Sequence, residues 1–204
     1  RIYACGGDGT LNEIVCGVAG FPNVAVTTYA GGSGNDFIRM FSQPEAFRDL
    51  EKLLDCQESQ FNLIRCNEDY ALNICSVGLD ARIAADVAGY ERFPMFSGFR
   101  AYLVSALINT IKGIWQPYTA SFEDETVRKD FTLICACNGR FYGGGFCPVP
   151  TADPTDGRLE VLLIRDVSRL KVAQVVGAYK AGKYADYPDL IRYFSADHVK
   201  IICD

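Results

Sequence analysis

The stretch Cys5-Gly6-Gly7-Asp8-Gly9-Thr10-Leu11-Asn12-Glu13 decides the fold of the first part of the chain. Its three glycines fall within four positions, so the backbone can turn sharply and approach a ligand closely. A short apolar run, Ile2 to Cys5, precedes the turn, and residues 10–18 follow with apolar side chains at helical spacing. We therefore expect a strand, a tight turn and a helix whose free N–H groups favour phosphate oxygens.

A second glycine-rich turn, Ala30-Gly31-Gly32-Ser33-Gly34-Asn35-Asp36-Phe37, follows the β-branched run Val24 to Thr28. Helices are expected from Asn35 onward and from Pro44 to Asp55, and strands alternating with helices indicate a parallel, Rossmann-like sheet. Turns that follow successive parallel strands lie side by side at the carboxyl edge, where α/β proteins bind ligands. Ser33 offers a hydroxyl there, and Asp36 a carboxylate for magnesium-bound water. The alternative for each turn is a plain strand-to-helix connection.

From about residue 61 the pattern changes to strands. The runs 61–66 and 70–77 flank Asn67-Glu68-Asp69 as in a hairpin, and further strands are expected at 118–123, 130–138, 158–165 and 198–203. The nearly all-apolar Phe131 to Cys135 predicts a central strand of a β-sandwich or barrel. A helix over 99–115 interrupts it, as a core helix or as one with a lipid-facing side. The predicted fold class is α/β plus β, with a partial nucleotide-binding domain at 1–61 and a β-sandwich domain at 62–204.

Composition limits the classes of function. A net charge of −5 over 204 residues argues against non-specific nucleic-acid binding. The nine cysteines include no Cys-x-x-Cys pair and there is one histidine, so zinc is not expected, and we expect buried, reduced thiols in a cytosolic protein. No signal peptide or membrane-length apolar run is visible. Both ends of the sequence resemble cut ends, so we expect a partial chain.

Four segments in order resemble the diacylglycerol kinase catalytic domain family, which includes bacterial lipid kinases and sphingosine-kinase relatives. Each segment matches a motif of that family, and together they cover nearly the whole chain. They are Gly6-Gly7-Asp8-Gly9-Thr10-Leu11-Asn12-Glu13, Gly32-Ser33-Gly34-Asn35-Asp36-Phe37, the run 72–81 (LNICSVGLDA), and the set Asn138-Gly139, Tyr142-Gly143-Gly144-Gly145, Pro150-Thr151-Ala152 and Asp156-Gly157-Arg158-Leu159.

The resemblance implies a kinase that uses ATP and Mg²⁺ on a lipid hydroxyl such as that of diacylglycerol. The nucleotide would lie against residues from both glycine-rich turns, and Asp8 and Asp36 would join the magnesium-water network. The implied binding residues are Gly6, Gly7, Asp8, Gly9, Thr10, Asn12, Glu13, Gly32, Ser33, Asn35 and Asp36. The implied structural magnesium loop contains Asp153, Asp156 and Arg158, and a plain turn is the alternative there.

The resemblance also implies what lies outside the chain and around it. The general base would be a Glu in an Asp-Gly-Glu segment beyond Asp204, so this chain alone is expected to be inactive. The expected partner is a lipid at a membrane surface, contacted peripherally from the cytoplasm. No nucleic acid is expected, and a homodimer is left open. The rival functions are an NAD-kinase-like enzyme with a soluble acceptor and a non-catalytic nucleotide- or lipid-binding module.

Overall fold

The computed structural model describes residues 1–90, 105, 108–109 and 113–203, which group into two compact units. The first unit comprises Arg1–Cys75, Cys137–Arg158 and Lys180–Gly182. The second comprises Ser76–Ala136, Leu159–Tyr179 and Lys183–Asp204. Because each unit gathers several chain segments, the division into domains at 1–61 and 62–204 stays a prediction.

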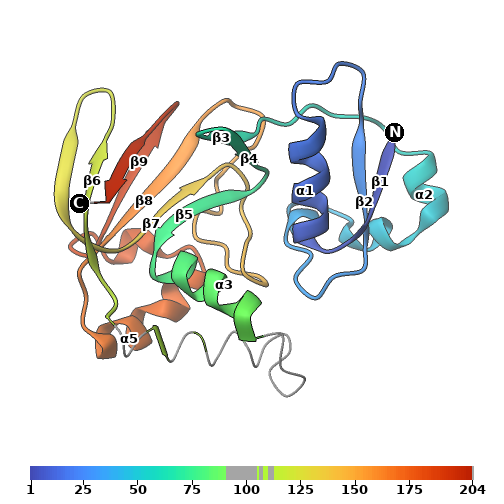
Figure 1. Cartoon of the computed structure of the whole chain (residues 1–204). Coiled ribbons are helices and arrows are strands. Elements are labelled where there is room, and N and C mark those ends of the chain that lie inside the picture. The colour runs from blue at the N-terminus through green and yellow to red at the C-terminus, as the bar shows by residue number, and fades with distance from the viewer. Residues whose placement is uncertain (91–104, 106–107, 110–112, 204) are drawn as a thin grey trace. The chain divides into compact units, whose positions relative to one another are not determined.

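The first unit is built on a parallel strand pair. β1 (Ile2–Gly6) pairs with β2 (Val26–Ala30) in parallel, with Ile2 opposite Val26 and Gly6 opposite Ala30. The helix α1 (Asp8–Val18) lies on one side of this pair and α2 (Leu50–Leu54) on the other (Figure 1). The predicted strand, turn and helix are confirmed. Ala4 and Leu11 are buried at 0% and 3% exposure, in a core cluster that also contains Leu72.

The helices expected after the second turn are shorter than the sequence pattern suggests. Residues 37–40 form a 3₁₀ helix, η1 (Phe37–Met40), and the helix predicted from Pro44 to Asp55 is divided into the 3₁₀ helix η2 (Pro44–Arg48) and α2. The division falls at Asp49, whose side chain accepts hydrogen bonds from the backbone N–H groups of Glu51 and Lys52. A capping carboxylate starts a new helix and so interrupts the old one.

The predicted hairpin is present, but the strand after it is divided. β3 (Ile64–Cys66) pairs antiparallel with β4 (Asp69–Ala71), and Asn67 takes a φ of 56° in the turn. β5 (Ile74–Gly78) begins after a bend at Leu72 and Asn73. The expected strand 70–77 is interrupted there because the carbonyl of Asn73 accepts from the N–H groups of Asn138 and Gly139.

The second unit is a mostly antiparallel sheet. Its strands are β6 (Gln116–Ser121), β7 (Thr126–Cys137), β8 (Leu159–Arg165), β9 (Ile191–Ala196) and β10 (Lys200–Cys203). They follow the order β10-β6-β7-β8-β9, and β5 also pairs with β7. The prediction of a central strand at Phe131 to Cys135 is confirmed. Phe131 and Ile134 are buried at 1% and 0% exposure in the core beneath it.

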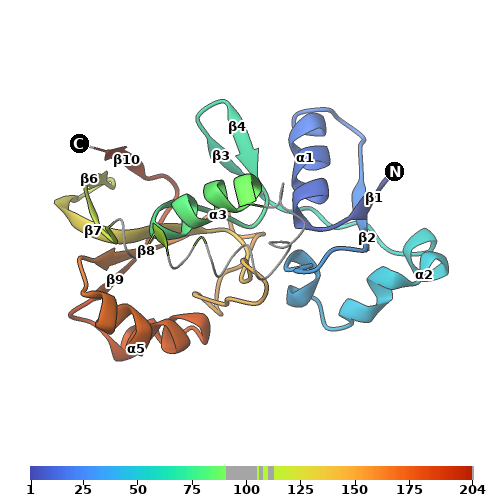
Figure 2. The same ribbon diagram turned by 60° about the horizontal axis from the view of Figure 1, so that its bottom comes forward.

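Helices α3 (Leu79–Tyr90) and α5 (Arg169–Lys180) and the 3₁₀ helix η3 (Tyr184–Asp186) complete the second unit. α5 lies beside the β8–β9 part of the sheet (Figure 2). Most of the helix predicted at 99–115 lies outside the described residues. Ser105, Ile108 and Asn109 are helical, whereas residues 113–115 are not, so the predicted end at Trp115 is wrong.

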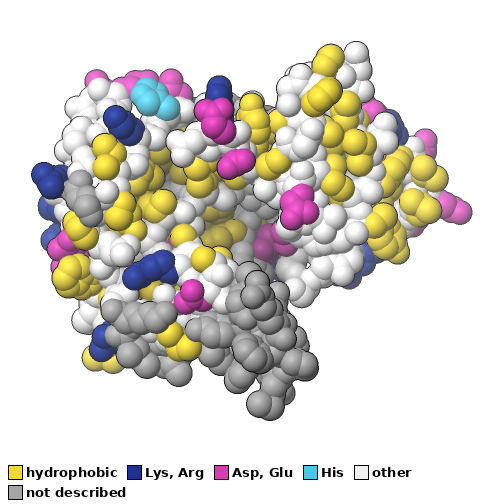
Figure 3. Space-filling view, viewed as in Figure 1, with side chains coloured by type: hydrophobic (Ala, Val, Ile, Leu, Met, Phe, Trp, Pro, Cys, Tyr) yellow, Lys and Arg dark blue, Asp and Glu magenta, His cyan; other side chains and the backbone are white. Residues whose placement is uncertain are grey.

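The cysteines are less buried than the sequence predicts. None of the nine forms a disulfide, but only Cys135 and Cys137 are buried, and three are exposed, so the prediction of generally buried thiols is wrong. Some apolar side chains are also exposed, among them Leu50 and Leu54 of α2. Hydrophobic side chains gather on the surface in the region of α2 (Figure 3). In the described part of the chain, none of the helices is long and apolar enough to cross a membrane.

Candidate nucleotide site

The first glycine-rich turn leads directly into α1. Gly7 is the N-cap residue, and the first N–H groups of a helix have no partner within it. Gly6 precedes it with the Thr10 side chain directly above: a Cβ atom added at Gly6 would lie 2.5 Å from Thr10 Oγ1. The turn therefore needs glycine at position 6, and it presents the positive end of the α1 dipole at the sheet edge.

The two glycine-rich turns touch through their backbones. A Cβ atom built on Gly32 would overlap the Cα atom of Gly7, and one built on Gly7 would come within 3.1 Å of the Cα atom of Gly32. The N–H of Gly31 donates to the carbonyl of Gly6 over 2.9 Å and continues the β1–β2 pairing into the turns. The expected side-by-side placement of the turns is confirmed, and it rests on the absence of side chains at both positions.

Asn35 closes the second turn upon itself. Its Oδ1 accepts from the N–H of Gly32 over 3.0 Å, and its Nδ2 donates to the carbonyl of Gly32 over 2.5 Å. The residue has a φ of 50° and is buried at 8% exposure. Asparagine tolerates this left-handed conformation better than most residues. Asn35 therefore shapes the turn, with both polar atoms of its side chain bound to the protein.

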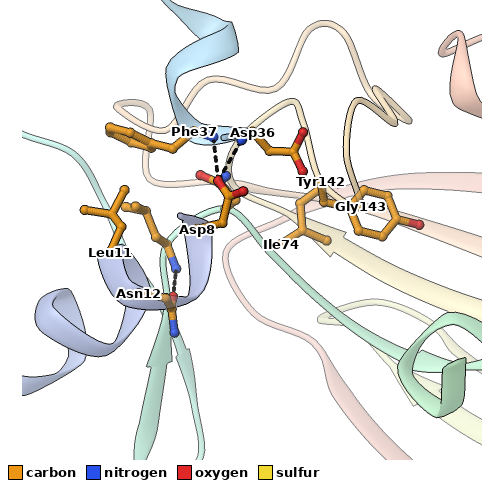
Figure 4. Close-up of a pocket in the computed structure, with 10 residues that line it drawn as sticks. Asp8, Leu11, Asn12, Asp36, Phe37, Ile74, Tyr142 and Gly143 are labelled. Atoms are coloured by element: carbon orange, nitrogen blue, oxygen red, sulfur yellow. Dashed lines mark hydrogen bonds between the residues drawn. The ribbon is translucent and has the colours of Figure 1, made fainter. Parts of the chain in front are cut away.

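Asp8 ties the start of α1 to the second turn. Its Oδ1 accepts from the N–H of Asp36 over 2.6 Å and from the N–H of Phe37 over 3.1 Å (Figure 4). Oδ2 faces Gly34, where an added Cβ would approach it to 2.8 Å. One oxygen of Asp8 therefore holds the turn, and the other lies at the edge of the site.

Asp36 is the most buried carboxylate of the site, at 4% exposure. Its Oδ2 accepts from the N–H of Gly144 over 2.7 Å. Arg39 Nε lies 3.1 Å from Oδ1, near enough for an ion pair but poorly directed, so Oδ1 has no hydrogen-bond donor. Burial raises the pKa of Asp36 above its ordinary value, and the neighbouring Asp8 charge raises it further, against the lowering effect of Gly144 and Arg39.

A pocket of about 180 Å³ opens between these turns and two further segments of the first unit. Figure 4 shows the side chains of Asp8 and Asp36 close together in the pocket wall, with Tyr142 and Gly143 on one side of them and Leu11 of α1 on the other. The pocket thus combines carboxylates and amides with apolar side chains. The residues that line it are Asp8, Leu11, Asn12, Asp36, Phe37, Leu72, Asn73, Ile74, Tyr142 and Gly143.

Asn12 lines the pocket but also joins α1 to the segment after β4. Its Oδ1 accepts from the N–H of Leu72 over 3.0 Å, and its Nδ2 lies 3.5 Å from Cys16 Sγ. The Cys16 thiol in turn donates to the carbonyl of Tyr70 over 2.9 Å. Asn12 therefore holds Leu72, and with it one wall of the pocket, against α1.

The other predicted binding residues lie on the same turns. Gly9, Thr10 and Glu13 are exposed on α1, and Ser33 is exposed in the second turn. Of the predicted binding residues, Asp8, Asn12 and Asp36 line the pocket. In the described part of the chain, the four exposed residues do not, and neither do Gly6, Gly7, Gly32 and Asn35. Two pocket segments, 72–74 and 142–143, were not predicted as binding residues, although both belong to segments that carry the family resemblance. The sequence gives the order of these two segments along the chain, but it does not show that they lie next to the glycine-rich turns in the folded structure.

The predicted magnesium loop is a sequence of local turns. Asp153 Oδ1 accepts from the N–H and the hydroxyl of Thr155, and Asp156 Oδ1 accepts from the N–H of Arg158. The Thr155 bonds lower the pKa of Asp153, so this carboxylate is readily ionised. Within the described residues, the group of three side-chain ligands lies elsewhere, at the exposed Glu123, Asp197 and His198. A metal ion at 153–158 would need main-chain oxygens in addition to these carboxylates, and that assignment stays a prediction.

The fold and the site together define an α/β protein with a candidate ligand pocket at the carboxyl edge of a parallel strand pair and with a second, sheet-rich unit. Family models match both parts of the chain. Residues 1–66 match the diacylglycerol kinase catalytic domain, and residues 73–204 match the YegS C-terminal NAD kinase beta sandwich-like domain. The chain belongs to this diacylglycerol kinase family, in the form that carries the YegS-type C-terminal domain.

The names of curated relatives agree with this family, and solved structures share the fold. A Staphylococcus aureus (strain Mu3) protein named "Putative lipid kinase" is 28% identical over 169 residues, which is 82% of this chain and 55% of that protein. A crystal structure of a "putative diacylglycerol kinase" from Bacillus anthracis has a TM-score of 0.74 at 22% identity and covers all of this chain and 67% of that one. A second, of a diacylglycerol kinase from the same organism, has a TM-score of 0.68 at 19% identity, covering 100% and 65%. The chain thus spans about half the length of the curated relatives it matches, and the fold class of α/β plus a sheet-rich domain is confirmed.

Proposed function

We propose that the protein is an ATP-dependent lipid kinase, which transfers the γ-phosphoryl group of ATP to a hydroxyl of a lipid such as diacylglycerol. The observation that carries the proposal is the backbone contact between the turns at Gly7 and Gly32, next to the N-terminus of α1. Membership of a kinase family supports phosphoryl transfer, and the names of the relatives support a lipid acceptor.

The residues present fit a nucleotide with a divalent cation. Two glycine-rich turns let phosphate oxygens approach backbone N–H groups. A Cβ atom at Gly32 would overlap Gly7 and force the two turns apart. Asp36 Oδ1 is a buried oxygen that accepts no hydrogen bond, although Arg39 Nε lies 3.1 Å from it, and it belongs to one of two neighbouring carboxylates. Carboxylates in this arrangement suit Mg²⁺. When bound, Mg²⁺ would bridge phosphate oxygens and neutralise their charge.

The chain's own residues would then act mainly by positioning. The N–H groups of the turn at 6–10 and, in the second turn, those of Ser33 and Gly34 would orient the phosphates for in-line transfer, which needs alignment more than covalent help. The N–H groups of Gly31 and Gly32 already donate to Gly6 and Asn35. Asp8 would hold the two turns at a fixed separation through its bonds to the backbone of the second turn, and Asn35 would keep the second turn in shape. The lipid oxygen forms the new bond to phosphorus, ADP leaves, and a carboxylate takes the hydroxyl proton. The base in an Asp-Gly-Glu segment beyond Asp204 stays a prediction.

The acceptor would be reached at a membrane surface. We propose peripheral contact from the cytoplasmic side, with the sheet-rich unit receiving the acyl chains. A homodimer remains open.

Transfer of labelled phosphate from ATP by the full-length protein tests the function. Diacylglycerol, sphingosine, ceramide and NAD are offered in parallel, each with Mg²⁺. We expect a labelled lipid and no labelled NAD, and we expect Gly32→Ala to abolish transfer while Gly177→Ala, at an open position of α5, retains it. Labelled NAD would favour the soluble-acceptor kinase. Tight ATP binding without any labelled product would favour a non-catalytic module and overturn the proposal.

A further inference from the structure

Two cysteine thiols of the first unit lie next to each other. Cys66 ends β3 and Cys75 lies in β5, nine positions further on, yet their Sγ atoms are 3.6 Å apart. Cys66 is exposed and Cys75 is partly buried. One thiol of the pair is therefore open to a reagent, and the other lies within reach behind it.

The distance is close to that needed for a covalent bond. A disulfide has an S–S length of about 2.05 Å, so the two sulfurs must approach by roughly 1.5 Å from their present separation. Cys66 is an exposed residue at the last position of the three-residue β3, so side-chain rotation and a small adjustment of the hairpin end would bring the sulfurs together.

We propose that Cys66 and Cys75 form a redox-active pair that closes to an intramolecular disulfide by exchange with a disulfide oxidant such as oxidised glutathione. The Cys66 thiolate attacks one sulfur of the oxidant and releases one glutathione thiolate, which leaves a mixed disulfide on Cys66. The Cys75 thiolate then attacks Cys66 Sγ and releases the second glutathione. The protein pair loses two electrons and two protons, and the oxidant is reduced to two thiols.

The bond would act on the wall of the pocket. Residues 67–74 lie between the two cysteines, and Leu72, Asn73 and Ile74 of this segment line the pocket. Asn12 already holds the N–H of Leu72. A bond from Cys66 to Cys75 would restrain the same segment from its other end, so the redox state of the pair controls the mobility of one pocket wall.

Peptide mass mapping tests the pair. The reduced chain, kept dilute to avoid links between molecules, is treated with oxidised glutathione, alkylated and digested. We expect the peptides of Cys66 and Cys75 to be joined, with the loss of two hydrogens, before the exposed Cys5 and Cys203 are modified to the same extent. Dithiothreitol should restore alkylation. In Cys66→Ser the link must vanish, and in the control Cys5→Ser it must form at the original rate. Stable glutathione on Cys66 without a link to Cys75 would overturn the proposal.

Hydrogen exchange tests the consequence for the pocket wall. In the oxidised chain, backbone amides of residues 67–74 should exchange several-fold more slowly than in the reduced chain. Cys66→Ser treated with the same oxidant should show no such slowing. Equal exchange at 67–74 in the linked and reduced chains would show that the bond leaves the wall unchanged and would overturn this step.

Discussion

Gly32 is the position where the absence of a side chain matters most to the site. A methyl group there would overlap the backbone of Gly7 and also approach Asn35 Oδ1 to 2.9 Å. Backbone atoms cannot move aside as the end of a flexible side chain can, so one turn would have to shift away from the other. The contact that brings both sets of N–H groups to one place would then be lost.

Replacement of Gly32 by alanine should therefore destabilise the chain by about 1–3 kcal/mol, the usual cost of overpacking. The matched control is Gly9→Ala, because Gly9 is helical and has open space around its Cα. Alanine there should be neutral or stabilise by up to about 1 kcal/mol. Urea unfolding of both variants measures the difference, and equal stabilities would contradict the close approach of the turns.

Asp8 is expected to act first through its acceptor oxygen. Asp8→Ala leaves the N–H groups of Asp36 and Phe37 without their acceptor, and should cost about 1–3 kcal/mol of unfolding free energy. Asp8→Asn keeps an oxygen in place and should cost much less, while it weakens Mg²⁺-dependent ATP binding because the charge is gone. Thermal unfolding and nucleotide titration of both variants separate the two roles. If Asp8→Asn were as unstable as Asp8→Ala, the role of the Asp8 oxygen as acceptor for the second turn would be contradicted.

Asp36 should make the free energy of unfolding depend on pH, and the direction of that dependence follows from its raised pKa. Burial and the nearby Asp8 charge raise its pKa in the native state above that of the unfolded chain. Between those two pKa values the native state holds more protons than the unfolded state, so the contribution of Asp36 to stability is lost as the pH rises. Compared with Asp36→Asn, the wild type should lose unfolding free energy as the pH rises through this acidic interval. A difference that is constant with pH, or of opposite slope, would count against a buried Asp36.

At the scale of elements, the sequence predicts the first strand-turn-helix and the parallel pairing because apolar periodicity and glycine placement agree there. It fails where one polar side chain changes the backbone path. Asp49 divides the helix predicted at 44–55 by capping its second half. Leu72 and Asn73 divide the strand predicted at 70–77 because distant residues bind their backbone groups. No local pattern reveals such long-range partners, and for the same reason the pocket wall at 72–74 was missed.

The passage from β5 to α3 depends on Gly78. This residue has a φ of +106°, and a Cβ atom there would lie 2.5 Å from the carbonyl oxygen of Thr132 in the neighbouring β7. Gly78→Ala combines backbone strain with a clash inside the sheet, so we expect a loss of roughly 3 kcal/mol or more. Gly177→Ala, at an open position of α5, should be neutral or slightly stabilising. Denaturant unfolding compares them, and a mild Gly78→Ala variant would contradict the tight β5–β7 contact.

At the scale of the molecule, the family follows from the order of the motifs rather than from any one of them. The Gly-Gly-Asp-Gly turn alone predicts a phosphate-binding turn, and the matches over residues 1–66 and 73–204 place the chain in the diacylglycerol kinase family. Sequence order also suggested which segments belong together. It could not show that residues 142–144, beyond β7, return to the first unit and bind Asp36.

The central claim is that the two adjoining glycine-rich turns form the ATP site, and amide NMR mapping of the 204-residue chain tests it most directly. On titration with ATP and Mg²⁺, the largest shifts should fall on the amides of residues 6–12 and 31–37, and Gly32→Ala should abolish them while Gly177→Ala preserves them. Shifts concentrated at residues 153–158 or in β8 and β9, or shifts that survive Gly32→Ala unchanged, would contradict the account.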